Sequence, residues 1–370
     1  MRFHVLGIPH TVTTPEYSTC AFTQKVVKLC TMLYGEGHEV IHYGHAESKV
    51  ECTESVTVTT DADLKASYGE HDWKKMGWPP FQQSDPVYAI FYKNAIAAIK
   101  ERQKPGDMLL CSFGNLHQPV ADAIPTLTAV EPGIGYPSEP FAKYRVFESY
   151  AVLHAYQGQK AIENASNSFW YDAVIPNSFD LKQFKFQQKK EDYFLFLGRI
   201  NGGKGAHIVR QLADATNSNI VVAGAGDYSF FKGCKHAVMA GVVGPELRQQ
   251  LLSKAKAVLC PSTFLEPFCG VQIEAMLSGT PVISSDWGAF AEYNIHGQTG
   301  YRCRTFEHFI WAAKNIEKIY PDSCRAWGVN FSLEKIAPRY TEYLTSVQDV
   351  ISGKGWYTER PDRTSLHVTN

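Results

Sequence analysis

The sequence predicts a two-domain α/β protein in which each domain is built on a parallel sheet. With 370 residues, the chain exceeds the length at which one hydrophobic core usually stops growing. Short apolar runs alternate with longer helix-like stretches, which is the pattern of parallel α/β layers. This alternation stops at a polar stretch, residues 182–192, and then starts again. We therefore expect a linker there, a first domain over residues 1–180 and a second over residues 190–332.

The first domain contains apolar runs that are bounded by turn residues, together with longer stretches of helical character. The opening apolar run is too short for a signal peptide and is interpreted as a first strand. The expected strands are residues 2–8, 38–43, 107–113 and 126–130, and the expected helices are residues 19–36, 86–103 and 143–160.

The second domain repeats this alternation. A final helix over residues 333–352 carries apolar residues at helical spacing and is expected to complete the first domain, while residues 359–370 form a polar tail. Ligands of open α/β sheets bind at the carboxyl ends of the strands, so we expect both sheets to present those ends to one cleft. The expected strands are residues 193–197, 219–223, 257–260 and 281–284, and the expected helices are residues 204–216, 245–255, 270–279 and 305–319.

The composition excludes several classes of protein. Hydrophobic residues make up 44% of the chain and charged residues 20%, as in a soluble globular protein, and no apolar run is long enough to span a membrane. The nine cysteines are scattered without a CxxC pair, so no disulfide framework or zinc site is indicated and a cytoplasmic location is expected. The first half is net acidic and the second half net basic, which favours an anionic ligand in the second domain and argues against a broad nucleic-acid surface.

A glycine-rich string directly follows the first strand of the second domain and opens a helix. Glycines at such a place let backbone amides approach an anion, and the helix N-terminus adds a partial positive charge. Arg199 and Lys204 would supply full charges for a diphosphate. The string approaches a Walker A loop, but Gly205 stands where that loop has its magnesium-binding hydroxyl. A glycine-rich turn with two solvated basic side chains explains the string equally well. The candidate donor-binding residues here are Gly198, Arg199, Gly203 and Lys204.

Two carboxylates, Glu266 and Glu274, flank a loop that leads into the helix expected over residues 270–279. Carboxylates recognise sugars and ribose because vicinal hydroxyls donate to their two oxygens. In isolation, a capping carboxylate and an exposed helical glutamate would explain this pair better. The neighbouring motifs favour the functional interpretation.

Taken together, these motifs resemble family 4 glycosyltransferases (glycosyl transferases group 1), which are retaining enzymes of the GT-B fold. The resemblance rests on Gly198-Arg199-x4-Lys204-Gly, Glu266-x7-Glu274-Ala, Gly279-Thr-Pro281, Gly288-Ala-x-x-Glu292 and Gly297-x-Thr-Gly300, and it covers about residues 174–300. It implies two Rossmann-like domains that face each other across a donor-binding cleft.

The resemblance also implies roles. Arg199 and Lys204 would hold the donor diphosphate, Glu274 the ribose hydroxyls and Glu266 the hydroxyls of the transferred sugar. Backbone amides of Phe268, Cys269 and Gly270 would approach sugar and phosphate. Cys269 stands where the family usually has glycine. If that position needs a positive φ, Cys269 is strained; the expectation is that the turn tolerates it and that only the fit to the sugar changes.

In the first domain, His117 follows a strand end and resembles the cleft histidine of the family, so it joins Arg199, Lys204 and Glu266 as a candidate catalytic residue. A buried structural histidine is the alternative interpretation. Fold analogy alone places further cleft or acceptor candidates after the first and fourth strands. They are Gly7, His10, Glu131, Gly133 and Tyr136.

Neither a metal nor a cofactor is expected. Asp61-Ala-Asp63 is interpreted as a helix start rather than a metal-binding motif, and the strand that opens the chain lacks the GxGxxG of dehydrogenases. The predicted reaction transfers a sugar from a nucleotide sugar to an acceptor hydroxyl with retention of configuration and without metal. The acceptor class stays open: a glycan, a lipid-linked carrier, a small molecule or a modified nucleic acid. The alternatives are a non-catalytic nucleotide-sugar binder and a GT-B epimerase or phosphorylase.

Overall fold

The structure, a computed structural model, describes residues 1–17, 19–135, 140–162 and 170–356. The chain divides into two compact units. Unit 1 consists of Met1–Glu148, Tyr156–Pro176 and Ile336–Asn370. Unit 2 consists of Ser149–Ala155 and Asn177–Lys335.

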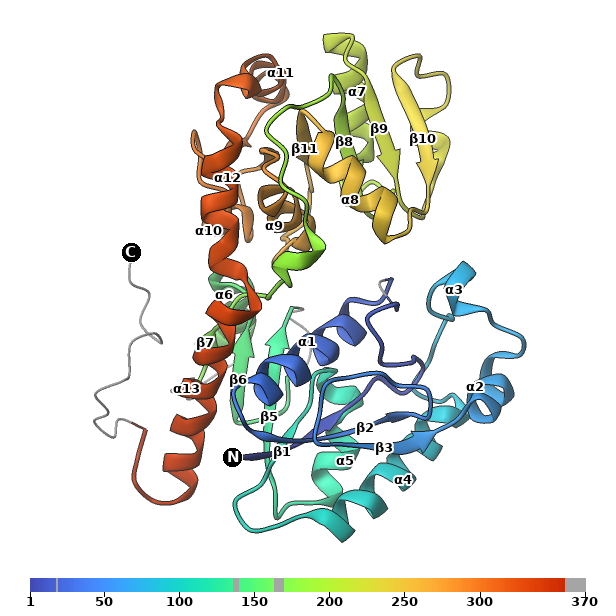
Figure 1. Cartoon of the computed structure of the whole chain (residues 1–370), viewed down its shortest axis with the longest axis vertical. Helices are drawn as coiled ribbons and strands as arrows, with labels where there is room; N and C mark the ends of the chain where they lie inside the picture. The colour runs from blue at the N-terminus through green and yellow to red at the C-terminus, as the bar shows by residue number, and fades with distance from the viewer. Residues whose placement is uncertain (18, 136–139, 163–169, 357–370) are drawn as a thin grey trace. The chain divides into compact units, whose positions relative to one another are not determined.

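Unit 1 is built on a seven-stranded parallel sheet of order β3-β2-β1-β4-β5-β6-β7 (Figure 1). The strand order runs outward in both directions from β1 and β4, so the ends of these two central strands mark the point where ligands bind in such sheets. The strands are β1 Arg2–Leu6, β2 Glu39–His45, β3 Glu54–Thr59, β4 Met108–Leu110, β5 Thr128–Ile134, β6 Tyr144–Phe147 and β7 Ala173–Val174.

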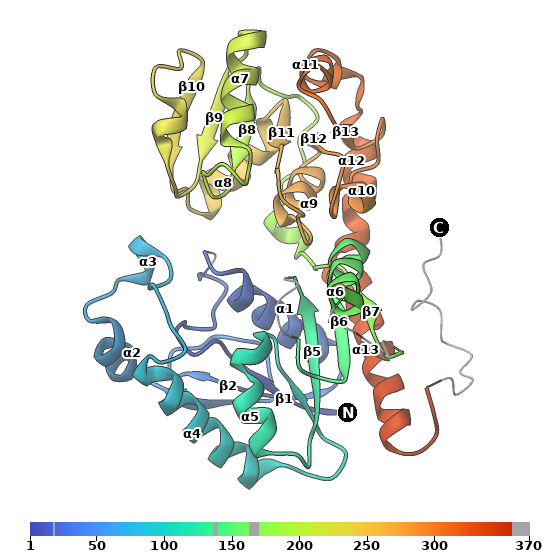
Figure 2. The same ribbon diagram turned by 180° about the vertical axis from the view of Figure 1, so that it is seen from behind.

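Helices cover both faces of this sheet: α1 lies on one face, and α4 with α5 on the other (Figure 2). Thr60 and Asp63 form a capping box at the start of α2, so the Asp61-Ala-Asp63 segment does begin a helix, as the sequence predicts. The helices are α1 Ala21–Gly35, α2 Asp61–Tyr68, α3 Trp73–Met76, α4 Pro86–Arg102, α5 Gln118–Ala123 and α6 Tyr150–Ile162, and α13 Leu333–Ile351 packs on the same unit.

Hydrogen bonds join α13 to unit 1. The Tyr343 hydroxyl donates to the carbonyl of Tyr171 at 2.9 Å, and the Arg339 guanidinium donates to the carbonyl of Val174 at 2.9 Å. The helix therefore adds its buried apolar stripe to unit 1, although almost 160 residues of unit 2 precede it in the chain.

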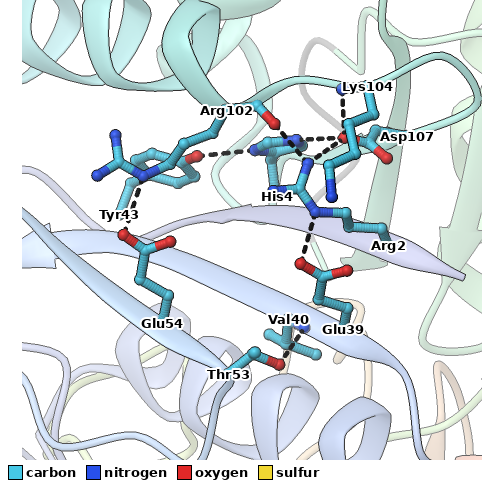
Figure 3. Close-up of polar contacts among 10 residues, drawn as sticks. All are labelled: Arg2, His4, Glu39, Val40, Tyr43, Thr53, Glu54, Arg102, Lys104 and Asp107. Atoms are coloured by element: carbon cyan, nitrogen blue, oxygen red, sulfur yellow. Dashed lines mark hydrogen bonds and ion pairs between the residues drawn. The ribbon is translucent and has the colours of Figure 1, made fainter.

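A polar network ties the starting ends of β1 and β4 together (Figure 3). Asp107, just before β4, accepts hydrogen bonds from Arg2 at 2.6 Å and from His4 at 2.9 Å, and His4 also contacts the Tyr43 hydroxyl at 2.8 Å. Burial alone would raise the pKa of Asp107, but its hydrogen bonds from His4, the Lys104 amide and Arg2 lower it. This network fixes the register of the central strands at the edge opposite their carboxyl ends.

Unit 2 is built on a six-stranded parallel sheet of order β10-β9-β8-β11-β12-β13. The outward order again starts from two central strands, here β8 and β11. The strands are β8 Phe194–Leu197, β9 Ile220–Ala223, β10 Ala237–Gly241, β11 Ala257–Cys260, β12 Val282–Ser285 and β13 Gly300–Cys303.

Two layers of helices enclose the unit 2 sheet. In one group α7 contacts α11. In the other, α9 contacts both α8 and α12. The helices are α7 Ala206–Thr216, α8 Pro245–Lys254, α9 Gly270–Leu277, α10 Phe290–Tyr293, α11 Phe306–Asn315 and α12 Pro321–Gly328. The prediction of two parallel-sheet α/β domains is therefore confirmed.

One predicted element is wrong in part. The helix expected over residues 143–160 begins only at Tyr150, because Tyr144–Phe147 is the fully buried strand β6. The segment Tyr144–Phe147 contains Arg145 and is not separated by a glycine or proline from the helix that follows, so the sequence does not mark it as a strand; pairing with β5 decides it. Among the described residues, no helix has both the length and the apolar character that a membrane span requires.

Candidate active site

The glycine-rich loop of unit 2, residues 198–205, connects the end of β8 to the start of α7. Gly205 has φ +78°, and a Cβ there would lie 2.1 Å from the carbonyl oxygen of Pro261, just after β11. Gly224 after β9 is equally constrained, since a Cβ there would lie 1.8 Å from the carbonyl oxygen of Gly198. Glycine is thus required at both positions because backbone meets backbone. The loop is held between the carboxyl ends of β9 and β11.

Lys204 is the cation that this loop presents next to a buried carboxylate. Its Nζ donates to Oε1 of Glu266 at 2.6 Å, and it also lies 5.0 Å from the centre of the Phe264 ring. Burial alone would lower the pKa of the Lys204 amine, but the proximity of Cys269 and Glu266, with the hydrogen bond to Glu266, raises it. Lys204 therefore stays charged at neutral pH while only one of its three protons is used by Glu266.

Glu266 is buried, and its hydrogen bonds converge on one oxygen. Ser262 Oγ donates to Oε1 at 2.6 Å, so Oε1 accepts from both Ser262 and Lys204. Among the described residues, Oε2 accepts no hydrogen bond. The backbone of Glu266 is fixed as well, since the Ala289 amide donates to its carbonyl at 2.9 Å. The carboxylate is thus oriented, with one oxygen left for a hydroxyl donor.

The turn before α9 holds Phe268, Cys269 and Gly270, and it decides the question about Cys269. Cys269 has φ +62° and ψ +76°, so this position does adopt the left-handed conformation in which glycine is favoured. A side chain in that conformation costs about 1–2 kcal/mol. The Cys269 thiol forms a hydrogen bond with that of Cys260, which together with burial raises the pKa of Cys260. The backbone at position 269 is therefore strained by a residue other than glycine.

Phe268 and Gly270 enter the site only through their backbone. The Phe268 ring is buried and lies 5.1 Å from the ring of Tyr293, in the core of unit 2. Gly270 is the first residue of α9. Because α7 and α9 both begin at this edge of the sheet, their unpaired N–H groups add positive potential beside Lys204.

Glu274 lies one turn into α9 and pairs with a residue that the sequence analysis missed. Arg248 on α8 donates to Oε2 of Glu274, with Nε at 3.0 Å and Nη2 also in contact. The Arg199 side chain, in contrast, is exposed, and within the described part of the chain it shows no ion pair or hydrogen bond. The structure thus joins Lys204 with Glu266, and Arg248 with Glu274.

In unit 1, His117 and Gly7 lie together at the carboxyl end of β1. His117 Nε2 is 3.0 Å from the Gly7 carbonyl, while Nδ1 of this buried ring contacts no hydrogen-bond partner among the described residues. Burial lowers the pKa of His117 to about 3. The ring is therefore neutral, with Nε2–H donating to Gly7 and Nδ1 available as an acceptor. A Cβ at Gly7 would meet Thr13 Oγ1 and the Tyr43 carbonyl, each at 2.9 Å, so the close packing here needs glycine.

His10 is buried within an aromatic cluster. Its ring stacks on Phe81 with centroids 3.9 Å apart, and its Nδ1 contacts the Tyr88 hydroxyl at 2.9 Å. Burial lowers the pKa of His10 to about 3. With 2% of its surface exposed, His10 supports the shape of the loop after β1 and presents little of itself to a ligand.

Glu131 and Gly133 lie in β5, and Tyr136 lies outside the described residues. Glu131 is buried, and its Oε2 accepts the amides of Phe141 and Ala142 at 2.8 Å each. Burial raises the pKa of Glu131 to about 7, although these two hydrogen bonds oppose the shift. Gly133 has φ +71°, and its carbonyl accepts from Lys25 at 2.9 Å.

We expect Glu131→Gln to stabilise unit 1 at high pH. The folded state keeps the Glu131 proton up to about pH 7, whereas the unfolded chain loses it near pH 4.5, so the contribution of Glu131 to stability falls as the pH rises through this window. The variant should gain about 1–3 kcal/mol over wild type at pH 8 and almost nothing at pH 5. Urea unfolding at the two pH values measures this difference, and an equal difference at both would refute the titration of Glu131.

Sequence patterns gave no signal for Arg248 or Ser262. Arg248 is a single basic residue on a predicted helix, 26 positions from its partner. Ser262 lies two residues after the end of β11, and only this position at the carboxyl end of a strand, not a motif, could have indicated it.

Comparison with known proteins finds similarity to glycosyltransferases. Residues 178–330 match the family described as Glycosyl transferases group 1. An uncharacterized glycosyltransferase of Methanocaldococcus jannaschii is 30% identical over 211 residues, 50% of each chain. Glycogen synthase of Mycobacterium tuberculosis is 31% identical over 147 residues, 35% of each chain. The chain thus spans half or less of the length of these relatives.

Solved glycosyltransferase structures superimpose on nearly the whole chain. AviGT4, a glycosyltransferase involved in avilamycin A biosynthesis, superimposes with a TM-score of 0.69 at 22% identity, covering 95% of this chain and 98% of its own. Anabaena HepE in complex with UDP and glucose gives a TM-score of 0.65 at 15% identity, covering 94% and 100%. At these identities the likeness shows the fold, two Rossmann-like domains of the GT-B type. Residues 178–330, within unit 2, thus resemble the glycosyl transferases group 1 family, and the whole chain shares the fold of these solved structures.

Proposed function

We propose that this chain transfers a sugar from a nucleoside diphosphate sugar to an acceptor hydroxyl, with retention of configuration and without a metal ion. The observation that carries the proposal is the ion pair between Lys204 and Glu266 at the glycine-rich loop, 2.6 Å long and flanked by the N-termini of α7 and α9. It lies in the segment that matches the glycosyl transferases group 1 family. Because HepE holds UDP, a uridine donor is the first to test.

The proposed donor roles follow the chemistry of each group. Lys204 uses one proton for Glu266 and has two left for phosphate oxygens, and the exposed Arg199 adds a second cation. Oε2 of Glu266 accepts a hydroxyl of the transferred sugar, and Glu274 accepts the ribose hydroxyls. Amides near Phe268, Cys269 and Gly270, with the loop amides of Gly202 and Gly203, complete the anion-binding surface.

The proposed mechanism places catalysis on the leaving group. As the glycosidic bond breaks, negative charge grows on the diphosphate, and Lys204 with the two helix N-termini stabilises that charge. The sugar passes through an oxocarbenium-like state, and the acceptor hydroxyl attacks from the same face while its proton passes to the departing phosphate. Glu266 orients the sugar in this scheme, because its Oε1 is already bound to Lys204 and Ser262.

For unit 1 we propose an acceptor-side role at the carboxyl ends of β1 and β5. His117 is kept as a candidate because its Nδ1 has no partner among the described residues and would accept a hydrogen bond from a hydroxyl, although its ring is as buried as that of His10. Gly133 and Tyr136 are retained as acceptor candidates, whereas His10 and Glu131 are proposed to shape the edge from within.

Thermal unfolding of the full chain with UDP-, GDP- and ADP-sugars tests the donor class. A ligand of the native state raises the melting temperature by mass action, so one base should produce a shift that saturates with concentration. A non-catalytic binder would shift without releasing nucleoside diphosphate, and an epimerase would change the sugar while keeping the donor intact. If no nucleotide sugar shifts the transition, the proposal fails.

We expect the activity to survive excess EDTA. Lys204 and two helix N-termini already supply the positive charge that a divalent cation would bring to the diphosphate. Initial rates with and without EDTA should agree within about twofold. Complete loss of activity that returns with Mg²⁺ or Mn²⁺ would show that the loop works with a metal ion.

A further inference from the structure

Arg248 makes an ion pair with one particular oxygen of Glu274. Two nitrogens of its guanidinium, Nε and Nη2, contact Oε2. The side chains are 36% and 16% exposed, so the pair lies at the surface of unit 2 rather than in its core. Exposed and half-exposed ion pairs contribute little to folding stability. Its main effect is therefore on the orientation of the carboxylate.

The other oxygen of Glu274 faces the start of α9. Oε1 lies 4.0 Å from the point where a Cβ would stand on Gly270, and the nearest atom of the Phe179 ring lies 3.7 Å from the same point. Within the described part of the chain, the hydrogen bonds of Glu274 go to Oε2 alone. The two oxygens thus differ: Oε2 is bound to Arg248, whereas Oε1 has no hydrogen bond among the described residues and lies beside Gly270 and the Phe179 ring.

We propose that Arg248 is a positioning residue for nucleotide recognition, which holds Glu274 so that Oε1 accepts a ribose hydroxyl. This inference rests on the proposed function and deepens it. A glutamate side chain on a helix surface samples several rotamers, and ordering it on binding costs free energy. The planar guanidinium fixes the carboxylate before the nucleotide arrives, which lowers that cost.

A plain structural tie between α8 and α9 is the competing explanation. It would affect every ligand of unit 2 equally, whereas a positioning role concerns only ligands that carry ribose hydroxyls. UDP and 2′,3′-dideoxy-UDP separate the two, because they share base and diphosphate and differ only in these hydroxyls. If thermal unfolding shows that the chain binds a guanosine or adenosine donor instead, the corresponding nucleoside diphosphate and its 2′,3′-dideoxy form replace these two compounds.

The experiment measures Kd for both nucleotides by calorimetry on the wild type, Arg248→Ala, Arg248→Lys and Glu274→Gln. A hydrogen bond from a hydroxyl to a carboxylate predicts about 10- to 100-fold preference for UDP in the wild type. Arg248→Ala should reduce this preference by at least about fivefold. The Kd for UDP should rise, while the Kd for the dideoxy nucleotide should stay unchanged. Arg248→Lys should restore part of it. In turnover, Arg248→Ala should raise the donor KM and leave kcat near wild type.

Gln250→Ala is the matched control, an exposed position on α8 that should behave as wild type. Full UDP preference in Arg248→Ala, or equal weakening of both nucleotides, would overturn the positioning role. Unchanged preference in Glu274→Gln would overturn the ribose role of Glu274 and the inference with it. A wild-type chain that binds no nucleoside diphosphate would instead refute the proposed function itself.

Discussion

Replacing Lys204 with alanine should reduce turnover by at least about 100-fold and also weaken the fold. The catalytic loss follows from removing the charge that stabilises the leaving diphosphate. The stability loss follows from the burial of Glu266, whose side chain is 3% exposed and would lose the cation that pairs with it. Breaking a buried pair on one side typically costs about 3–5 kcal/mol, and the 23% exposure of Lys204 places this case at or below the lower end.

A double variant separates the two losses. Lys204→Met combined with Glu266→Gln removes both charges and keeps similar volumes, so urea unfolding should recover toward wild type while turnover stays lost. Arg199→Ala, at an exposed position, should lose turnover with unchanged stability. A Lys204→Ala variant with near-normal kcat would contradict the leaving-group role. The alternative interpretation of Lys204 as a solvated basic side chain does not hold, because Lys204 contacts the buried Glu266.

The second large effect, on stability and nucleotide binding, is expected for Gly224→Ala. Gly224 itself contacts no ligand in the proposed site. Gly224 has φ +136°, and its Cβ would stand 1.8 Å from the carbonyl oxygen of Gly198. Because backbone cannot rotate away, the start of the glycine-rich loop must shift. Conformational strain and overpacking each cost about 1–3 kcal/mol. We expect a loss of about 2–6 kcal/mol in the free energy of unfolding and weaker nucleoside diphosphate binding.

Gly202→Ala, a glycine substitution within the glycine-rich loop itself, provides the comparison for stability. A Cβ at Gly202 would meet only the Phe230 ring, 4.0 Å away, so this variant should unfold within about 1 kcal/mol of wild type. Urea denaturation of the two variants side by side measures the difference. Equal stability would mean that β9 and the loop are not held together as described.

The central strands of both units could be predicted from the sequence, since fully buried parallel strands are continuous apolar runs with glycines at their ends. The edge strands could not. Glu54–Thr59 and Ala237–Gly241 are half exposed, so their apolar content is diluted by polar or small residues. Strand β6 contains a charged residue and is not separated by a glycine or proline from the helix that follows, so it was predicted as part of that helix.

The candidate site was predictable where it depends on local sequence and not where it depends on contacts across the fold. The glycine-rich loop and the glutamates of α9 carry short motifs. The partners are distant: 62 residues separate Lys204 from Glu266, and 110 separate His117 from Gly7. The burial of His10 depends on Phe81, which belongs to a segment that no periodicity places. The positive φ of Cys269 likewise follows from the turn and not from the residue.

Release of nucleoside diphosphate from a nucleotide sugar tests the central claim most directly. The full chain and Lys204→Ala are incubated with UDP-, GDP- and ADP-sugars, and the free nucleoside diphosphate is quantified by chromatography. We predict that the wild type releases the diphosphate of one base, slowly to water and faster once an acceptor is present, and that Lys204→Ala lowers this release by at least about 100-fold. Release that is equal in both proteins, or absent with every donor while none of them binds, would contradict the account.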